Sequence, residues 1–101
     1  MKTQGCFFHL RQALKRKLGE YNMLKKLKED REFRHCFNLL SALAFVKPED
    51  VKTVFEAMIQ EPSFHPDLKD FVMDYFKPTY IEGPNGTRPF IKIEKWNVFY
   101  R

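Results

Sequence analysis

The sequence predicts a mainly α-helical protein: a single helical domain over residues 1–101, with about four helices and a short extended or hairpin segment at its C-terminal end. Apolar residues recur every three or four positions through most of the chain before the last quarter, the period of one helical face. Prolines divide this pattern into helix-sized pieces. With 44% hydrophobic residues, including eleven Phe, the chain can also bury a core.

The first helix is predicted over residues 7–21. Its apolar positions are Phe7, Leu10, Ala13, Leu14, Leu18 and Tyr21. Arg11, Lys15 and Arg16 lie largely off this stripe, so we expect them to face solvent. Gly19 is expected to end or loosen the helix, and residues 22–29 contain enough Leu, Lys and Met to continue or restart it.

Two further helices follow, separated by Pro48. The second begins at about Asp30, and its apolar positions are Phe33, Phe37, Leu39, Leu40, Leu43 and Ala44. The third begins with Pro48 and two acidic residues, which the helix macrodipole favours in a first turn. Pro62 is expected to end it.

A fourth helix is predicted from Pro66 to Pro78. Its apolar positions are Leu68, Phe71, Val72, Tyr75 and Phe76. Beyond it, short β-branched and aromatic runs at 79–81 and 90–93 flank a loop rich in Gly, Pro and Asn. This arrangement predicts two short extended segments, or a hairpin, packed on the helices.

Positive charge is concentrated in the first third of the chain. The formal net charge is +5, and residues 1–34 hold ten Lys or Arg against four Asp or Glu, whereas the remainder holds eight against nine. Lys and Arg gathered on one surface neutralise phosphates and release counterions, so this asymmetry favours contact with nucleic acid. A solvated basic helix would produce the same asymmetry.

Cys6 and His9 are the first candidate metal ligands. Their Cys-x-x-His spacing brings a thiolate and an imidazole within reach of one ion, which would make half of a tetrahedral zinc site. His35 or Cys36 could complete it, although adjacent helical residues point in different directions. Alternatively, Cys6 is a buried apolar side chain and His9 hydrogen-bonds near the helix start. A nucleophilic Cys–His pair is disfavoured, because the sequence has no signature for an orienting group or an oxyanion site.

Aromatic and cationic residues are interleaved near the C-terminus, between Phe90 and Trp96. Aromatic side chains flanked by cations can stack on bases. Half-buried positions beside a core have the same composition, and this core interpretation is favoured for both residues.

Two cysteines are too few for the disulfide framework of a small secreted domain, and no apolar signal-peptide core follows Met1. The sequence therefore predicts an intracellular protein. No run approaches the roughly 18 apolar residues of a membrane span, so no membrane partner is expected.

A longer pattern extends over nearly the whole chain from Gly5 onward. It comprises Gly5, Cys6, Phe7, Phe8, His9, Leu10, Gln12, Ala13, Leu14, Arg16, Lys17, Tyr21, Leu40, Ala42, Leu43, Ala44, Phe45, Val46, Pro48, Asp50, Val51, Phe55, Tyr75, Phe76, Thr79, Tyr80, Ile81, Trp96, Asn97, Val98 and Phe99. In this order the residues resemble the segment of Mutator-like (MULE) transposases that runs from a Cys-x-x-His motif toward the last catalytic residue.

The resemblance implies a helical insertion within the ribonuclease H-like nuclease of a transposable element, and a nuclear location. The family's catalytic aspartates precede the Cys-x-x-His motif, matched by Cys6 and His9, and its catalytic glutamate follows a Trp-Asn motif, matched by Trp96 and Asn97. We therefore expect a fragment of a larger catalytic region that is not itself an enzyme. Mg²⁺ or Mn²⁺ would belong only to a full-length parent. At Cys6 and His9 the motif would bind zinc or serve packing.

Two functions are expected from these observations. In the first, the chain is a non-catalytic fragment or domesticated derivative of a transposase, and Arg11, Lys15, Arg16 and Lys17 contact the DNA backbone. In the second, it is a helical protein-interaction or dimerisation module without a DNA role, whose exposed aromatic side chains bind another copy or a full-length transposase. Charge reversal at Lys15 and Arg16 should abolish only the first.

Overall fold

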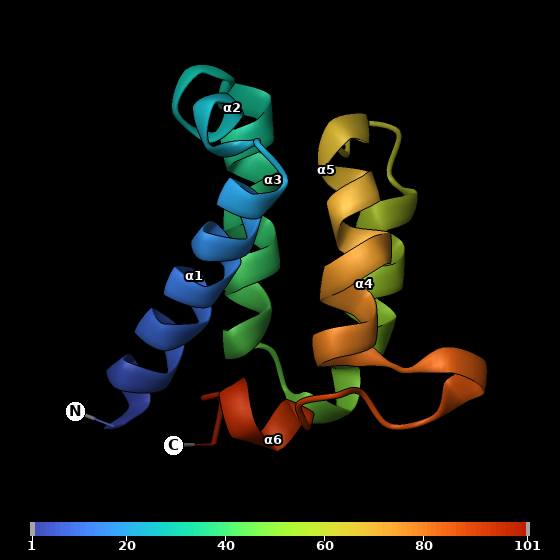
Figure 1. Ribbon diagram of the computed structural model, residues 1–101. Helices are drawn as coiled ribbons and strands as arrows, with labels where there is room; N and C mark the ends of the chain where they lie inside the picture. The colour runs from blue at the N-terminus through green and yellow to red at the C-terminus, as the bar shows by residue number, and fades with distance from the viewer. Residues whose placement is uncertain (1, 101) are drawn as a thin grey trace.

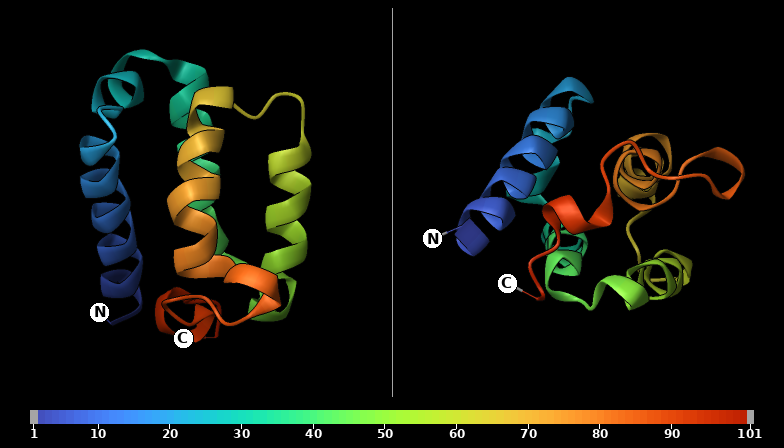
Figure 2. Two further views of the ribbon diagram at one scale, coloured as in Figure 1. Left: turned by 45° about the vertical axis from the view of Figure 1, so that its right-hand side comes forward. Right: turned by 90° about the horizontal axis from the view of Figure 1, so that it is seen from below.

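The structure is a computed structural model that describes residues 2–100, with side chains described from His9 onward. Its elements are α1 (Lys2–Glu20), α2 (Leu24–Glu29), α3 (Arg31–Ala42), η1 (Leu43–Phe45), η2 (Pro48–Asp50), α4 (Val51–Gln60), α5 (Pro66–Phe71), η3 (Val72–Ile81), η4 (Pro84–Gly86) and α6 (Ile93–Trp96). Four rods, namely α1, α3, α4 and the continuous α5–η3, alternate in direction, with α2 at one end and α6 at the other (Figures 1 and 2). The predicted mainly helical fold is confirmed.

α1 ends at Glu20 through Asn22, and not through Gly19. Asn22 has a left-handed φ of 60°, and the N–H of Met23 bonds the carbonyl of Leu18 at 2.9 Å, the features of a Schellman cap. Gly19 lies inside the helix, where an added Cβ would meet the Leu24 side chain at 3.2 Å. The glycine therefore serves the close approach of α2 to α1.

α3 begins at an aspartate cap, in agreement with the predicted start near Asp30. Asp30 Oδ1 accepts a hydrogen bond from the N–H of Phe33 at 3.1 Å, which satisfies one of the free donors of the first turn. The buried face of α3 consists of Phe33, Cys36, Phe37, Leu40 and Ser41. The chain then tightens into η1, and the extended Val46 ends the helical region before Pro48.

The next two helix starts are proline starts, as predicted. Pro48 is the first residue of η2, which leads directly into α4. Pro66 is the first residue of α5, and the side chain of His65 before it accepts a hydrogen bond from the N–H of Asp67. A histidine therefore caps α5.

The predicted helix end at Pro78 and the predicted hairpin beyond it are both wrong. The α5 rod continues past Pro78 as the π-helical segment η3, and no strand occurs between residues 2 and 100. In an α-helix the ring of Pro78 would clash with the carbonyl four residues before it. The wider π turn relieves this crowding, and the N–H of Glu82 bonds the carbonyl of Lys77, five residues back, at 2.9 Å.

The segment expected to form the second strand caps η3 instead. The N–H groups of Phe90 and Ile91 bond the carbonyls of Pro78 and Thr79 at 3.0 and 2.7 Å. Carbonyls in the last turn of a helix have no further donors within that helix. Residues 90–91 supply those donors, so this extended segment pairs with a helix end and not with another strand.

The core lies between the four rods and is rich in phenylalanine. Its fully buried aromatic side chains are Phe33, Phe37, Phe55, Phe71 and Phe76. Leu10, Leu14 and Leu18 are also buried, which confirms the predicted apolar stripe of α1 where side chains are described. Each such side chain contributes about 1.5–3 kcal/mol on burial. No helix within residues 2–100 has the length and apolar character needed to span a bilayer.

Candidate nucleic-acid interface

The strongest candidate site is an open groove between α1, α2 and α3, three elements that pack together on one side of the bundle (Figure 1). Its volume is about 860 Å³, and it is lined by Arg11, Lys15, Leu24, Lys25, Leu27, Lys28, Glu29, Arg34 and Asn38. Five of these nine residues are cationic and one is acidic. We call this feature the basic groove.

Helical spacing explains why these cations share one surface. Arg11 and Lys15 are four residues apart on α1, and Lys25 and Lys28 are three apart on α2, so each pair lies on one helical face. Arg34 comes from the facing side of α3. The basic groove therefore combines charge from three elements, whereas the sequence pattern had assigned it to one.

Arg11 is held in place by α3. Its Nη1 donates to Asn38 Oδ1 at 3.2 Å, and its guanidinium carbon lies 5.1 Å from the centre of the Phe37 ring. A guanidinium stacked on an aromatic ring keeps a fixed plane. This arginine therefore enters the groove with a defined orientation.

Arg34 joins α2 to α3. Its Nη1 donates to the carbonyls of Leu27 and Lys28 at 3.2 and 2.9 Å. These carbonyls end α2, where cationic donors also interact favourably with the helix dipole. The bond fixes the orientation of α2 and, with it, the position of Lys25 and Lys28.

Only two of the four cations predicted to contact DNA line the basic groove, namely Arg11 and Lys15. Lys17 pairs with Glu20 at 3.0 Å, and its Nζ lies 5.2 Å from the centre of the Tyr75 ring, so it faces η3. Arg16 is exposed on the same side. Burial raises the pKa of Tyr80 above its ordinary value, and the positive charge of Arg16 lowers that pKa by a smaller amount.

The predicted zinc site lies partly outside the described residues, because the side chain of Cys6 is among those not described. His9 is exposed on α1. Among the described side chains, no three His, Cys, Asp or Glu gather closely enough to hold a metal ion. His35 is exposed and Cys36 is buried on α3, in agreement with the expectation that these neighbours point in different directions. Zinc at Cys6 and His9 stays a prediction.

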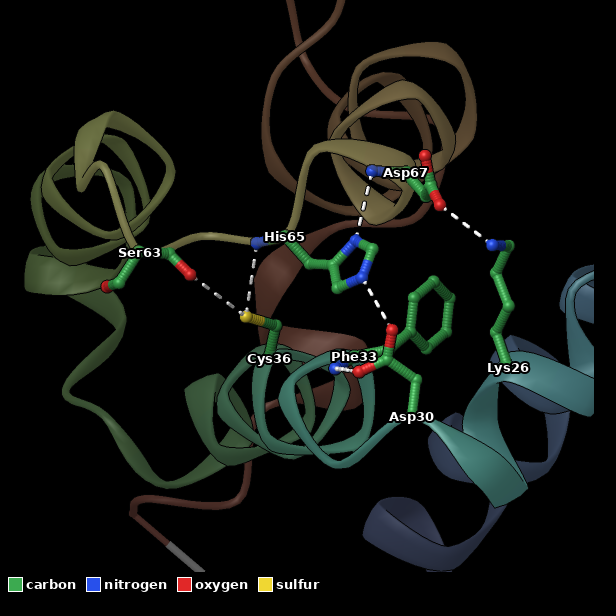
Figure 3. A network of polar contacts seen from close by, with 7 residues as sticks. All are labelled: Lys26, Asp30, Phe33, Cys36, Ser63, His65 and Asp67. Carbon is green, nitrogen blue, oxygen red and sulfur yellow. Dashed lines mark hydrogen bonds and ion pairs between the residues drawn. The ribbon is translucent and has the colours of Figure 1, made fainter.

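A polar network that the sequence analysis missed connects α3 to α5 (Figure 3). His65 Nδ1 accepts from the N–H of Asp67 at 3.1 Å, so Nε2 carries the proton that it donates to Asp30 Oδ2 at 2.8 Å. Lys26 Nζ lies 2.8 Å from Asp67 Oδ2. The sequence signal was present, because Asp30 and His65 each precede a predicted helix start.

The network holds two carboxylates in their charged form. The pKa of Asp30 is lowered chiefly by the hydrogen bond from the N–H of Phe33 and next by that from His65. The pKa of Asp67 is lowered chiefly by the hydrogen bond from Lys26. Cys36 Sγ approaches the backbone N–H of His65 at 3.4 Å, and both ring nitrogens of His65 have other partners. The arrangement therefore stabilises the joint and does not form a Cys–His nucleophile.

Trp96 and Asn97, the family-motif residues, attach the C-terminal segment to the bundle. Trp96 is buried, and its Nε1 donates to the Tyr80 carbonyl at 3.2 Å. Asn97 Nδ2 donates to the carbonyls of Leu43 and Val46 at 3.2 and 2.7 Å. Both residues therefore hold the C-terminal segment against the helices, and the predicted core location of Trp96 is confirmed.

Searches of family models, curated proteins and solved structures gave no match to this chain. The resemblance to Mutator-like transposases therefore stays a prediction from the sequence.

Proposed function

We propose that this chain binds the phosphate backbone of DNA through the basic groove. The observation that carries the proposal is the convergence of five cations from three helices, with Glu29 the one carboxylate among the groove's lining residues. Each phosphate carries a negative charge, and its neutralisation by Lys or Arg releases condensed counterions, which drives binding. The groove has the charge that this partner requires.

Fixed and mobile cations have different tasks in such a groove. Arg11 and Arg34 have guanidinium groups oriented by protein contacts, and a planar guanidinium suits the paired oxygens of a phosphate. Lys15, Lys25 and Lys28 are exposed and present ammonium groups on flexible stems. Two oriented donors would set the register of the backbone, while the lysines follow it.

Binding through this groove should tolerate many DNA sequences. Apart from the charged residues, its lining consists of Leu24, Leu27 and Asn38. Asn38 already accepts a hydrogen bond from Arg11, which leaves little polar surface to read base edges. The likeness to transposases supports the same partner, and the proposed role is DNA binding without strand cleavage, in the nucleus.

The first prediction compares two neighbouring residues of α1. Lys15→Ala should weaken binding to a mixed-sequence duplex and reduce the slope of log Kd against log salt by about 0.9, the equivalent of one phosphate contact. Arg16→Ala removes the same charge one position along, outside the groove, and should leave the slope unchanged. Fluorescence anisotropy of a labelled duplex over a range of KCl concentrations measures both.

The two variants also decide between the candidate functions. Equal losses in Lys15→Ala and Arg16→Ala would indicate a diffuse basic surface and would contradict a groove. If the wild-type chain bound no duplex at low salt, the protein-interaction role would be the better description. A Lys69→Ala variant, on the exposed surface of α5, controls for the change in net charge.

A protein-interaction or dimerisation role is favoured by a separate observation at the α6 end of the bundle. Phe45, Phe99 and Tyr100 are 52%, 42% and 68% exposed. They come from neighbouring segments, because the N–H of Val98 bonds the carbonyl of Ala44 at 2.7 Å. Exposed aromatic side chains gathered in one place are typical of protein contacts. Charge changes in the basic groove should leave this role intact.

A further inference from the structure

Phe90 is exposed, contrary to the predicted core location. Its relative exposure is 88%, the largest of any big apolar side chain that the structure describes. Trp96, grouped with it in the sequence, is buried at 4%. Phe90 follows the loop around η4, which projects from the side of the bundle away from α1 (Figures 1 and 2). The two aromatic residues therefore have different roles.

The backbone beneath Phe90 is fixed. The N–H groups of Phe90 and Ile91 bond the end of η3, and the side chain of Ile91 packs against the core. At the base of the loop, the N–H of Gly83 bonds the carbonyl of Thr87 at 2.9 Å. An apolar ring held by a fixed backbone and left in water is a platform that a flat apolar partner can cover with little loss of backbone freedom.

Cations flank this platform. Exposure alternates from residue 88 to 93, so Arg88 and Lys92 are exposed with Phe90, while the residues between them are half-buried. Lys52 of α4, Arg88 and Lys92 also line one open hollow of about 340 Å³, in which Glu94 is the one carboxylate. The surface therefore presents an aromatic face beside a hollow with a net positive charge.

We propose that this surface binds single-stranded nucleic acid, with one base stacked on Phe90 and an adjoining phosphate at the hollow formed by Lys52, Arg88 and Lys92. A base offers its flat face to a side chain only when it is unstacked, as in a single strand. Aromatic stacking and backbone neutralisation together are the usual basis of such binding. The site is separate from the basic groove and does not depend on it.

A tryptophan at the platform gives a direct readout. Phe90→Trp keeps a stacking face and adds an exposed fluorophore, whereas the single natural tryptophan, Trp96, is buried. Oligothymidylate of ten nucleotides should quench the new fluorescence at low salt, and the wild-type signal should stay unchanged. Quenching should survive Lys15→Ala, which separates this site from the proposed groove.

Matched variants test the stacking itself. Phe90→Leu keeps an apolar side chain without a flat face, and together with Phe90→Ala it should weaken oligothymidylate binding roughly 5- to 150-fold, the range for loss of one stacked base. Met73→Ala truncates another exposed apolar side chain, 46% exposed, and should bind as wild type. Because Phe90 lies outside the core, all these variants should unfold at the wild-type denaturant concentration.

Four results would overturn the proposal. In the first, oligothymidylate binds but Phe90→Trp fluorescence is not quenched. In the second, Phe90→Leu binds as tightly as wild type. In the third, poly-glutamate quenches Phe90→Trp as strongly as the oligonucleotide does, which would assign the platform to an acidic protein segment. In the fourth, thymidine monophosphate binds as tightly as oligothymidylate at the same nucleotide concentration, which would assign the platform to a free nucleotide and not to a strand.

Discussion

Lys15 and Arg16 are adjacent in the sequence but belong to different surfaces. One step along an α-helix turns the side chain by about 100°, since a turn holds 3.6 residues. Lys15 therefore lines the basic groove, while Arg16 lies on the side facing Tyr80. A run of basic residues in a helix predicts charge, but contact with one partner needs a spacing of three or four residues, such as the four that separate Arg11 from Lys15.

Tyr21 connects the end of α1 to η3 through its hydroxyl group. Its hydroxyl hydrogen-bonds the carboxylate of Asp74 on η3, and this bond is the largest cause that raises the pKa of Tyr21 to about 12. A raised folded-state pKa contributes stability that is fully present below the unfolded-state value of about 10, and that is lost as pH rises through about 12. Tyr21→Phe should therefore be less stable than wild type at neutral pH, with the difference narrowing above pH 10.

The measurements are denaturant unfolding at several alkaline pH values and a spectroscopic tyrosinate titration. Asp74→Asn serves as the control, because it should move the Tyr21 transition back toward the ordinary tyrosine pKa while keeping the ring. If the titration of wild type and Asp74→Asn coincided, the hydrogen bond would not be the cause of the shift.

At the scale of elements, helix ends carry most of the polar structure. Asn22 closes α1, Asp30 opens α3, His65 opens α5, and Arg34 bonds the last carbonyls of α2. Asp30 and His65 also bond each other. The caps of two helices distant in the sequence thus form one joint, in which each helix start helps to position the other.

The joint should make stability depend on acid. Because the folded-state pKa of Asp30 is lowered, its contribution is fully present above the unfolded-state value of about 4 and is lost as pH falls through the lower folded value. Asp30→Asn presents an amide N–H where His65 needs an acceptor, so it should be less stable than wild type at pH 6. The difference should shrink below about pH 4.

Urea unfolding from pH 6 to pH 2.5 tests this, with Asp70→Asn as a variant of equal charge change outside the network. If the difference in the free energy of unfolding between wild type and Asp30→Asn stayed constant with pH, the charge of Asp30 would not contribute to stability.

The elements also show what the sequence could predict. Helix positions followed from apolar spacing and from proline and acidic starts, because these depend on local residues such as Asp30, Pro48 and Pro66. The path of the chain beyond Pro78 could not be predicted in this way, because a π turn can accommodate proline. The donors that bond the last carbonyls of η3 come from Phe90 and Ile91, which are distant from this turn in the sequence. Of the basic groove, only Arg11 and Lys15 were predicted, because the contact of α1 with α2 and α3 depends on tertiary packing. The exposure of Phe90 also depends on tertiary packing, so the sequence pattern did not predict it.

At the scale of the whole molecule, the two proposed binding surfaces lie on different sides of one bundle. The basic groove belongs to α1, α2 and α3, whereas the hollow beside Phe90 is lined by α4, the end of η3 and the segment after the loop around η4, which projects away from α1 (Figure 2). One surface suits duplex backbone and the other an unpaired strand. A chain with both could hold a duplex beside a region where its strands are separated.

Asn97 attaches the C-terminal segment to the chain between α3 and α4. Its amide donates to the carbonyls of Leu43 and Val46, and its Oδ1 accepts from the N–H of Phe99 at 2.9 Å. Asn97→Ala would remove these bonds and leave the part-buried Val46 carbonyl and Phe99 N–H without them, while the Leu43 carbonyl would keep only the N–H of Val46. The free energy of unfolding should therefore fall by about 1–3 kcal/mol. Gln60→Ala, at an exposed position of α4, should change it by less than about 0.5 kcal/mol.

Urea unfolding followed by circular dichroism measures both variants. A loss in Asn97→Ala no larger than that in Gln60→Ala would mean that water replaces the amide and that the C-terminal segment is only loosely attached.

The loop base at Gly83 has a consequence for how this protein can diverge. A side chain added there would lie 2.6 Å from Thr87 Oγ1 and 2.7 Å from the Arg88 carbonyl, so the two sides of the loop could not close. The tip, by contrast, has exposed residues such as Asn85 and Gly86. Both have left-handed φ angles, of 57° and 75°, which favour Asn and Gly, so backbone conformation restricts substitution at the tip, whereas lack of space restricts it at Gly83. The loop that leads to Phe90 therefore depends on small or turn-forming residues at three of its positions.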